Sequence, residues 1–333
     1  MTCRSRGLGI GRALSVLTVA ALAFALVCGA NDGAALVALN LGDRFVRPLA
    51  ALVILSVVLA LGPVLLGTEV AATFVHRLVA FEGDSGRSAL LAAVIVAVAV
   101  VFVLQRQGLP TSLTLALTGA IVGVGLGSGL AVGWGSVLLA LVAGAVAPLA
   151  SGALAFALQR LLPAMPRRAP LHARLAILRV GGFLLQCLAY AANDGQKMIA
   201  VLSVAAVTTA VEPTIRPEPL ELVAIGVLFG LGALLGVPRY GTALGRGIAP
   251  TRPAQTGIAE LSAALAVFGG AALGAPVSMT QSTTAALVGA GASAAYRQVR
   301  WGQAMRIVVA WLVTLPASVV IAALFAAVAG WAR

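Results

Sequence analysis

The segment AANDGQKM, residues 191–198, places two charges and two amides inside one of the most apolar stretches of the chain. Between Val180 and Val211 the only charged side chains are Asp194 and Lys197, and Lys197 is the only lysine of the protein. Charged groups are costly to bury in apolar surroundings unless they have partners. The fold therefore has to supply those partners, and a related segment, GANDG at residues 29–33, raises the same requirement a second time.

The composition indicates an all-α, polytopic membrane protein. Of the 333 residues, 61% are hydrophobic and 10% are charged, and the mean hydropathy is +1.06, whereas a soluble domain carries about 25% charged residues. Successive apolar runs of about 20 residues are long enough for helices that cross a bilayer. The first run, which ends in GAND, is predicted to stay in the protein as a membrane helix. We therefore expect a multi-pass protein of the cell membrane, surrounded by the lipid bilayer.

The positive charge of the chain is interpreted as a signal of membrane topology. The net charge is +12, and most of it comes from arginines that lie between the apolar runs. Because cytoplasmic loops of membrane proteins are rich in arginine, topology explains this charge better than binding of nucleic acid does. The three cysteines and two histidines have no metal-ligand spacing, so we expect neither a metal centre nor a cofactor.

Two pairs of similar segments divide the chain into two halves. GANDG at 29–33 matches AANDG at 191–195, and GLPTSLTLALTGAIVGVG at 108–125 matches GAPVSMTQSTTAALVGAG at 274–291, at offsets of 162 and 166 residues. Similar segments in the same order at a nearly constant offset indicate a duplicated unit. We predict a first transmembrane repeat over residues 1–160, a basic linker over 161–179 and a second transmembrane repeat over 180–333.

The charges around the linker predict opposite orientations for the two halves. The region from 160 to 179 holds arginines and no acid, so we expect it in the cytoplasm. These arginines are Arg160, Arg167, Arg168, Arg174 and Arg179. The loop 212–221 holds three glutamates and one arginine and is expected outside. This pattern gives each half an odd number of crossings, about five, which is the inverted-repeat organisation of secondary transporters.

The Asn-Asp pair of each half is a candidate cation site. Asp32 is the only charged residue between Ala13 and Gly42, and an ionisable group in a membrane helix is by default a functional site that faces the protein interior. Because glycine follows each pair, we predict helix breaks at 29–33 and 191–195. The expected ligands of a coupling Na⁺ or H⁺ are Asn31, Asp32, Asn193 and Asp194. The alternative is a polar clamp in which these side chains bond neighbouring helices.

The second pair of segments predicts a site for an oxyanion. Pro110 and Pro276 suit the first turn of a helix, and free backbone N–H groups at a helix start attract anions. The polar residues at these starts are Thr111, Ser112, Thr114, Ser278, Thr280 and Gln281. The helices that follow are short, so we expect re-entrant hairpins. The alternative role for the hydroxyls is helix N-capping. Glu260, a further acid in an apolar segment, is either a structural clamp or part of the cation path.

These motifs resemble the signatures of the PiT family of inorganic phosphate transporters, over nearly the full chain. That family carries GAND in its first half, GANDAQK in its second and GLPVSTTH in each hairpin; the corresponding residues here are 29–32, 192–197 and 276–281. The resemblance implies symport of phosphate with Na⁺ or H⁺, commonly as a homodimer, and it places Gln196 with the hairpin hydroxyls in the phosphate site. The family includes sulfate permeases, so sulfate or another tetrahedral oxyanion is the alternative substrate.

The sequence departs from the family pattern in both halves. Ala35 stands where the family often has asparagine, and Leu115 and Gln281 stand where it has the hairpin histidine. An intramembrane enzyme that acts on lipid phosphates is the competing class. Such an enzyme needs an activated nucleophile or a metal cluster, and the apolar runs contain no constellation of that kind. We therefore expect a transporter and not an enzyme.

Overall fold

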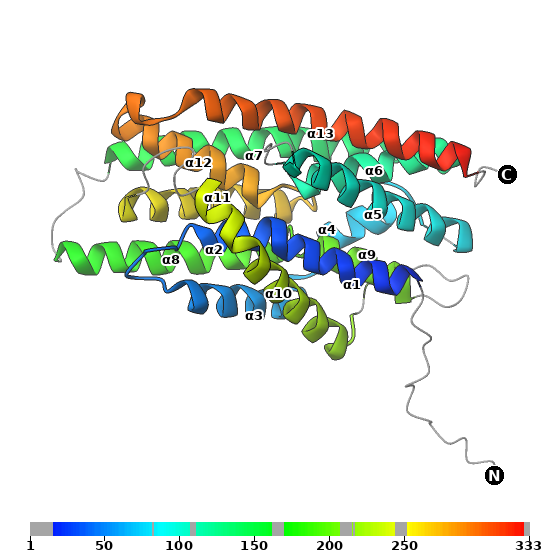
Figure 1. Cartoon of the computed structure of the whole chain (residues 1–333), viewed down its shortest axis with the longest axis horizontal. Coiled ribbons are helices and arrows are strands. Elements are labelled where there is room, and N and C mark those ends of the chain that lie inside the picture. The colour runs from blue at the N-terminus through cyan, green and yellow to red at the C-terminus, as the bar shows by residue number, and fades with distance from the viewer. Residues whose placement is uncertain are drawn as a thin grey trace, which may run out of the picture.

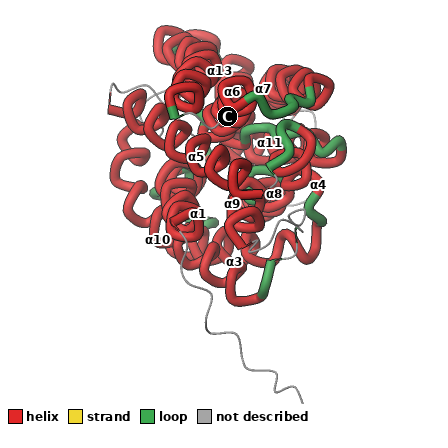
Figure 2. Tube along the Cα trace, turned by 90° about the vertical axis from the view of Figure 1, so that its right-hand side faces the viewer, coloured by secondary structure: helices red, strands yellow, loops and turns green. Residues whose placement is uncertain are grey.

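The computed structural model describes residues 16–81, 83–106, 111–161, 170–206, 215, 217–243 and 252–329, and within these ranges the chain is helical apart from its connecting turns and loops. Most helices run along the longest axis of the molecule, while α10 crosses it obliquely (Figure 1). The end-on view in Figure 2 shows the helices as a bundle. Among the described residues, seven helices are long and apolar enough to cross a membrane. The predicted all-α, polytopic class is confirmed.

Each half of the sequence forms a series of helices. The first half contains α1 (Val16–Cys28), η1 (Gly29–Gly33), α2 (Ala34–Ala38), α3 (Pro48–Leu66), α4 (Glu69–Ala72), η2 (Thr73–Arg77), α5 (Gly83–Arg106), α6 (Leu113–Ser128) and α7 (Trp134–Leu161). The second half contains α8 (Leu171–Ala192), α9 (Gln196–Ala206), α10 (Pro219–Ala243), α11 (Pro253–Ala272), α12 (Met279–Ala294), η4 (Tyr296–Gln298) and α13 (Trp301–Val328). The equivalence of α6 with α12, each of 16 residues, follows the sequence repeat. The inverted orientation of the halves stays a prediction.

Helices of one half pack against helices of the other. The long helix α3 of the first half contacts α8, and α10 of the second half contacts α1 and η1. In the same way α6 contacts α13, and α12 contacts α7. The two sequence repeats are therefore interleaved, and each completes the packing of the other.

Polar side chains lie inside this bundle and apolar ones cover it. Asp32, Asp194 and Lys197 are at most 2% exposed, whereas Leu149 is 74% and Leu312 is 70% exposed. A soluble protein has the reverse distribution. The distribution fits a protein whose surrounding solvent is the hydrocarbon of a bilayer.

The helix break predicted at 29–33 is wrong, and the one predicted at 191–195 is present. The segment 29–33 forms a π-helical turn that continues α1 into α2, and Gly33 keeps right-handed helical angles. Gly33 instead permits close packing, because a Cβ atom there would lie 2.6 Å from the Phe229 ring. In the second half α8 ends at Ala192, Asn193 has non-helical angles, and a turn leads into α9.

The segment predicted as the basic linker is partly helical. The helix α7 ends at Leu161 and α8 already begins at Leu171, so 171–179 belongs to a helix. Arg179, which we counted among the cytoplasmic arginines, is fully buried in α8. An arginine that pairs with carboxylates inside the protein gives no information about topology. Residues 162–169, which carry Arg167 and Arg168, lie outside the described residues.

Small residues allow α6 and α13 to approach closely. The glycines Gly119, Gly123 and Gly127 of α6 lie one turn apart and face backbone carbonyls of α13. A Cβ atom at Gly123 would lie 2.3 Å from the Val319 carbonyl oxygen. Close backbone approach at small residues is a common way for membrane helices to associate.

We expect Gly123→Ala to destabilise the protein and Gly144→Ala to leave it as stable or slightly more so. The added methyl at 123 forces α6 and α13 apart, an overpacking that costs about 1–3 kcal/mol. A methyl group at Gly144 in α7 would have no other atom within 4 Å, so only the better helix propensity of alanine acts there. Thermal unfolding of the two purified variants in detergent compares them, and equal melting temperatures would contradict the packing role of Gly123.

Candidate functional site

The repeated motifs of both halves meet at Asp194. One carboxylate oxygen, Oδ2, accepts a hydrogen bond of 2.6 Å from the backbone N–H of Met279, the first residue of α12. The other, Oδ1, accepts a hydrogen bond of 2.6 Å from the hydroxyl of Thr114, in the first turn of α6. The carboxylate therefore touches the beginning of both hairpin helices, where the positive end of a helix dipole stabilises negative charge.

Lys197 joins the aspartates of the two halves. Its ammonium lies 2.6 Å from Oδ2 of Asp32, 3.0 Å from Oδ1 of Asp194 and 3.1 Å from the hydroxyl oxygen of Thr114. The lysine side chain is fully buried. Sequence reasoning noted Lys197 but did not assign it to a site. Its position one helical turn after Asp194, as the only lysine in an apolar run, was the available signal.

Asp32 is held by neighbours from its own half and from the second. Asn31 donates a hydrogen bond of 2.7 Å to Oδ1 of Asp32, and the hydroxyl of Tyr190 donates one of 3.3 Å to Oδ2. Gln105 of α5 in turn donates to the side-chain carbonyl of Asn31. The π turn at 29–33 thus directs its Asn-Asp pair into a polar cluster. The helix break at 193–195 directs Asp194 into the same cluster.

Asn193 and Gln196 bond to backbone groups in this structure. The amide of Asn193 donates to the Ala275 carbonyl and accepts from the Val277 N–H, both at 2.9 Å, and so fixes the loop before α12. The amide of Gln196 accepts from the Ala71 N–H at 2.9 Å and donates to the carbonyl of the last residue of α8, the helix before its own. These contacts are those of the polar-clamp alternative, and the predicted ligand roles of both residues stay predictions.

The serines at the two hairpin starts are helix N-caps with nearly the same backbone angles. Ser112 has φ −99° and ψ 119°, Ser278 has φ −93° and ψ 119°, and each side chain accepts a hydrogen bond from an N–H three residues on. The capping alternative is therefore present in the structure. A hydroxyl that accepts in this way keeps its own proton as a donor, so capping and anion contact are compatible.

The other predicted hairpin residues lie around these caps. The hydroxyl of Thr111 bonds that of Thr314 in α13, and the hydroxyl of Thr280 lies 3.0 Å from that of Ser278. Gln281 is buried, and its side-chain carbonyl has no hydrogen-bond partner among the described residues.

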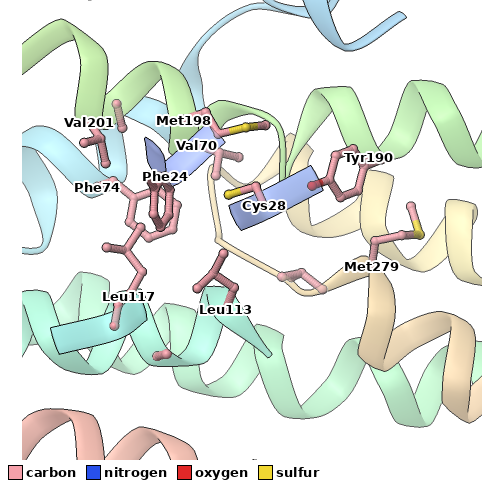
Figure 3. Close-up of a cluster of buried hydrophobic side chains, with 14 of the residues drawn as sticks. Phe24, Cys28, Val70, Phe74, Leu113, Leu117, Tyr190, Met198, Val201 and Met279 are labelled. Atoms are coloured by element: carbon pink, nitrogen blue, oxygen red, sulfur yellow. The ribbon is translucent and has the colours of Figure 1, made fainter. Parts of the chain in front are cut away.

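The helices that carry the polar cluster also carry large buried side chains with little or no polarity. Cys28 and Tyr190 are fully buried, as are Met198, Leu113 and Met279, and Figure 3 shows these five side chains with their apolar neighbours from several helices. Low-polarity surroundings strengthen the attraction between Lys197 and the aspartates, because little solvent screens it. They also make each unpaired charge more costly.

A second buried ion network lies apart from these motifs. Arg179 of α8 donates to Asp43 at 2.7 Å, to Asn40 at 2.8 Å and to Glu260 of α11. The side chains of Arg179 and Glu260 are fully buried and that of Asp43 is 8% exposed. Two roles were considered for Glu260, a structural clamp and a part of the cation path. These contacts are those of a clamp, because they tie the segment after α2 to two helices of the second half.

The fold and the buried cluster define a polytopic membrane transporter. The sequence matches the Phosphate transporter family over residues 28–184 and 175–322. The chain belongs to this family, which confirms the resemblance that its motifs indicated.

Relatives agree with this membership, and a solved structure has a similar fold. A probable low-affinity inorganic phosphate transporter of Mycobacterium leprae is 33% identical over 91% of this chain and 75% of its own. Proteins with the same description from Rhizobium meliloti and Bacillus subtilis are 30% and 26% identical over 92% and 93% of this chain, and over 94% and 95% of their own. A solved structure described as "The sodium-dependent phosphate transporter" matches with a TM-score of 0.79 at 19% identity, over 94% of this chain and 98% of that one. The relatives are transporters by name, which agrees with the prediction that the protein is not an enzyme.

The Arg179 network predicts a pH-dependent contribution of Asp43 to stability. Burial works against the charged form of Asp43, but hydrogen bonds from Arg179 and from the N–H groups of Phe45 and Val46 outweigh it and hold the pKa of this carboxyl below its ordinary value. A carboxyl whose pKa is lowered by folding stabilises the native state above its unfolded pKa of about 3.9 and loses that effect as the pH falls through the native pKa.

We therefore expect Asp43→Asn to lower the free energy of unfolding by roughly 1–3 kcal/mol at pH 7. The difference from the parent protein should shrink as the pH falls below about 4. Thermal unfolding of both proteins in detergent between about pH 3.5 and 7.5 measures this difference. That range spans the onset of carboxyl protonation. A difference that grew on acidification would contradict the role assigned to the carboxylate.

Proposed function

We propose that the protein is a symporter of inorganic phosphate, coupled to Na⁺ or H⁺ and situated in the cytoplasmic membrane. The observation that carries the proposal is that Lys197 joins Asp32 and Asp194, one from each half, and that Asp194 contacts the starts of α6 and α12. A coupled transporter needs an anion site and a cation site close enough for each ligand to affect the other. The membership of the Phosphate transporter family and the names of the relatives support phosphate as the anion.

The hairpin starts supply the chemistry for the anion. The N-capping serines Ser112 and Ser278 stand at the beginnings of two helices, with Thr111 and Thr280 beside them. Backbone N–H groups and hydroxyls suit a tetrahedral oxyanion. We assign the phosphate to this region, together with Thr114, Gln281 and Gln196.

The aspartate pair supplies the chemistry for the cation. Buried carboxylates bind hard monovalent cations or protons, and in membrane proteins they mark ion pathways. We assign the coupling ion to Asp32 and Asp194, with Asn31 and Asn193 as neighbouring amide ligands. The homodimer implied by the PiT resemblance is part of this proposal, with an apolar outer face of the bundle as the contact.

Uptake into proteoliposomes tests the proposal. We expect the purified protein to accumulate radiolabelled phosphate when an inward Na⁺ or H⁺ gradient is imposed, and unlabelled phosphate to compete better than sulfate. Empty liposomes, and proteoliposomes with both gradients dissipated, are the controls. Stronger competition by sulfate would reassign the substrate to another tetrahedral oxyanion, and uptake that ignores both gradients would remove the coupling.

Asp194→Asn should reduce gradient-driven phosphate uptake by about tenfold or more, because hydrogen bonds to a charged group contribute about 1.5–3 kcal/mol. The amide keeps the shape of the side chain but removes its charge. Since Asp194 contacts both hairpin helices, we expect this variant to be more severe than Asp32→Asn. Glu69→Gln is the matched control, because Glu69 pairs with Arg77 and is 70% exposed. Parent-like uptake by both aspartate variants would restore the clamp interpretation of the pair.

A further inference from the structure

Lys197 occupies a position with the coordination of a cation site. Three oxygen atoms surround its ammonium at 2.6–3.1 Å, two from carboxylates and one from a hydroxyl. Oxygen ligands of this kind are those that a hard metal cation takes in proteins. The site is also fully buried, so the charge at its centre has to be supplied either by the protein or by a bound ion.

The protein supplies only one such charge for two acidic positions. At the repeat offset of 162 residues, Asp194 corresponds to Asp32 and Lys197 corresponds to Ala35. The second half therefore brings a cation with its aspartate and the first half does not. Two carboxylates and one ammonium leave one uncompensated negative charge within the cluster.

We infer that Lys197 takes the place of one coupling cation, so that the aspartate pair accepts one external cation per transport cycle instead of two. This inference rests on the proposed cation-coupled function. The ammonium sits on a flexible four-carbon chain, so it stays with the protein while an external cation enters and leaves beside it. Both carboxylates are thereby partly compensated at every stage of the cycle.

The test counts the cations that bind at the pair in the absence of phosphate. The melting temperature of the purified full-length protein is followed against NaCl concentration, with choline chloride holding the ionic strength constant, and against pH in a second series. Ligand binding to the native state raises stability with a slope that reports the number of ligands bound. The parent slope should correspond to about one cation, and that of Lys197→Met to about two.

Matched variants separate a change in cation number from general damage. Lys197→Arg keeps the charge and should keep the parent slope. Arg179→Met removes another fully buried cation that pairs with two carboxylates, and it should lower the melting temperature without changing the slope. The double variant Lys197→Met/Asp32→Asn restores the parent net charge and should restore the parent slope.

Asp32→Asn keeps the inference testable if Lys197→Met does not fold. With one carboxylate removed, the charges of Asp194 and Lys197 cancel. The slope of melting temperature against cation concentration should therefore fall to about zero. A parent-like slope in Lys197→Met or in Asp32→Asn would overturn the inference. A slope that increased in Arg179→Met as much as in Lys197→Met would also overturn it.

Failure of the proposed function is recognisable separately. A parent protein that shows neither cation-dependent stabilisation nor gradient-driven phosphate uptake would overturn both proposals. A parent that takes up phosphate with a cation gradient, while Lys197→Met keeps the parent slope, would overturn only the role of Lys197.

Discussion

The attraction between one ammonium and two carboxylates governs the interior of this protein. A lone carboxylate inside an apolar bundle costs several kcal/mol, and Lys197 lies close enough to Asp32 and Asp194 to offset part of that cost for both. This contact places the π turn of the first half beside the α8–α9 turn of the second. Thr114 completes the arrangement and brings the start of α6 with it.

The two halves meet this constraint with different backbone geometry. In the second half the chain leaves the helix at Asn193, so that Asp194 reaches the start of α12 while the amide of Asn193 fixes the preceding loop. In the first half a π turn suffices, because Asp32 needs to reach only Lys197, Tyr190 and its neighbour Asn31. A duplicated motif has thus become asymmetric, and only one copy interrupts its helix.

Hydropathy and repetition were enough to predict the class of fold and the motifs of the site. The helix break at 29–33 was predicted wrongly, since Gly33 faces the ring of Phe229 and provides packing space instead of a break. Arg179 was misread for a related reason. Its carboxylate partners are Asp43, which precedes it by 136 residues, and Glu260, which follows it by 81. Contacts between residues so distant in sequence depend on tertiary packing, which a local pattern does not contain.

Because the two halves are interleaved, Asp32 is synthesised well before its partners in the second half. Lys197 follows Asp32 by 165 residues, and at translation rates of about 5–20 residues per second the lysine is synthesised roughly ten to thirty seconds after the aspartate. The helix α10, which covers α1, is made later still. During that interval the first repeat has no ammonium for its carboxyl group. The nascent Asp32 carboxylate therefore has to stay near water until the second repeat arrives.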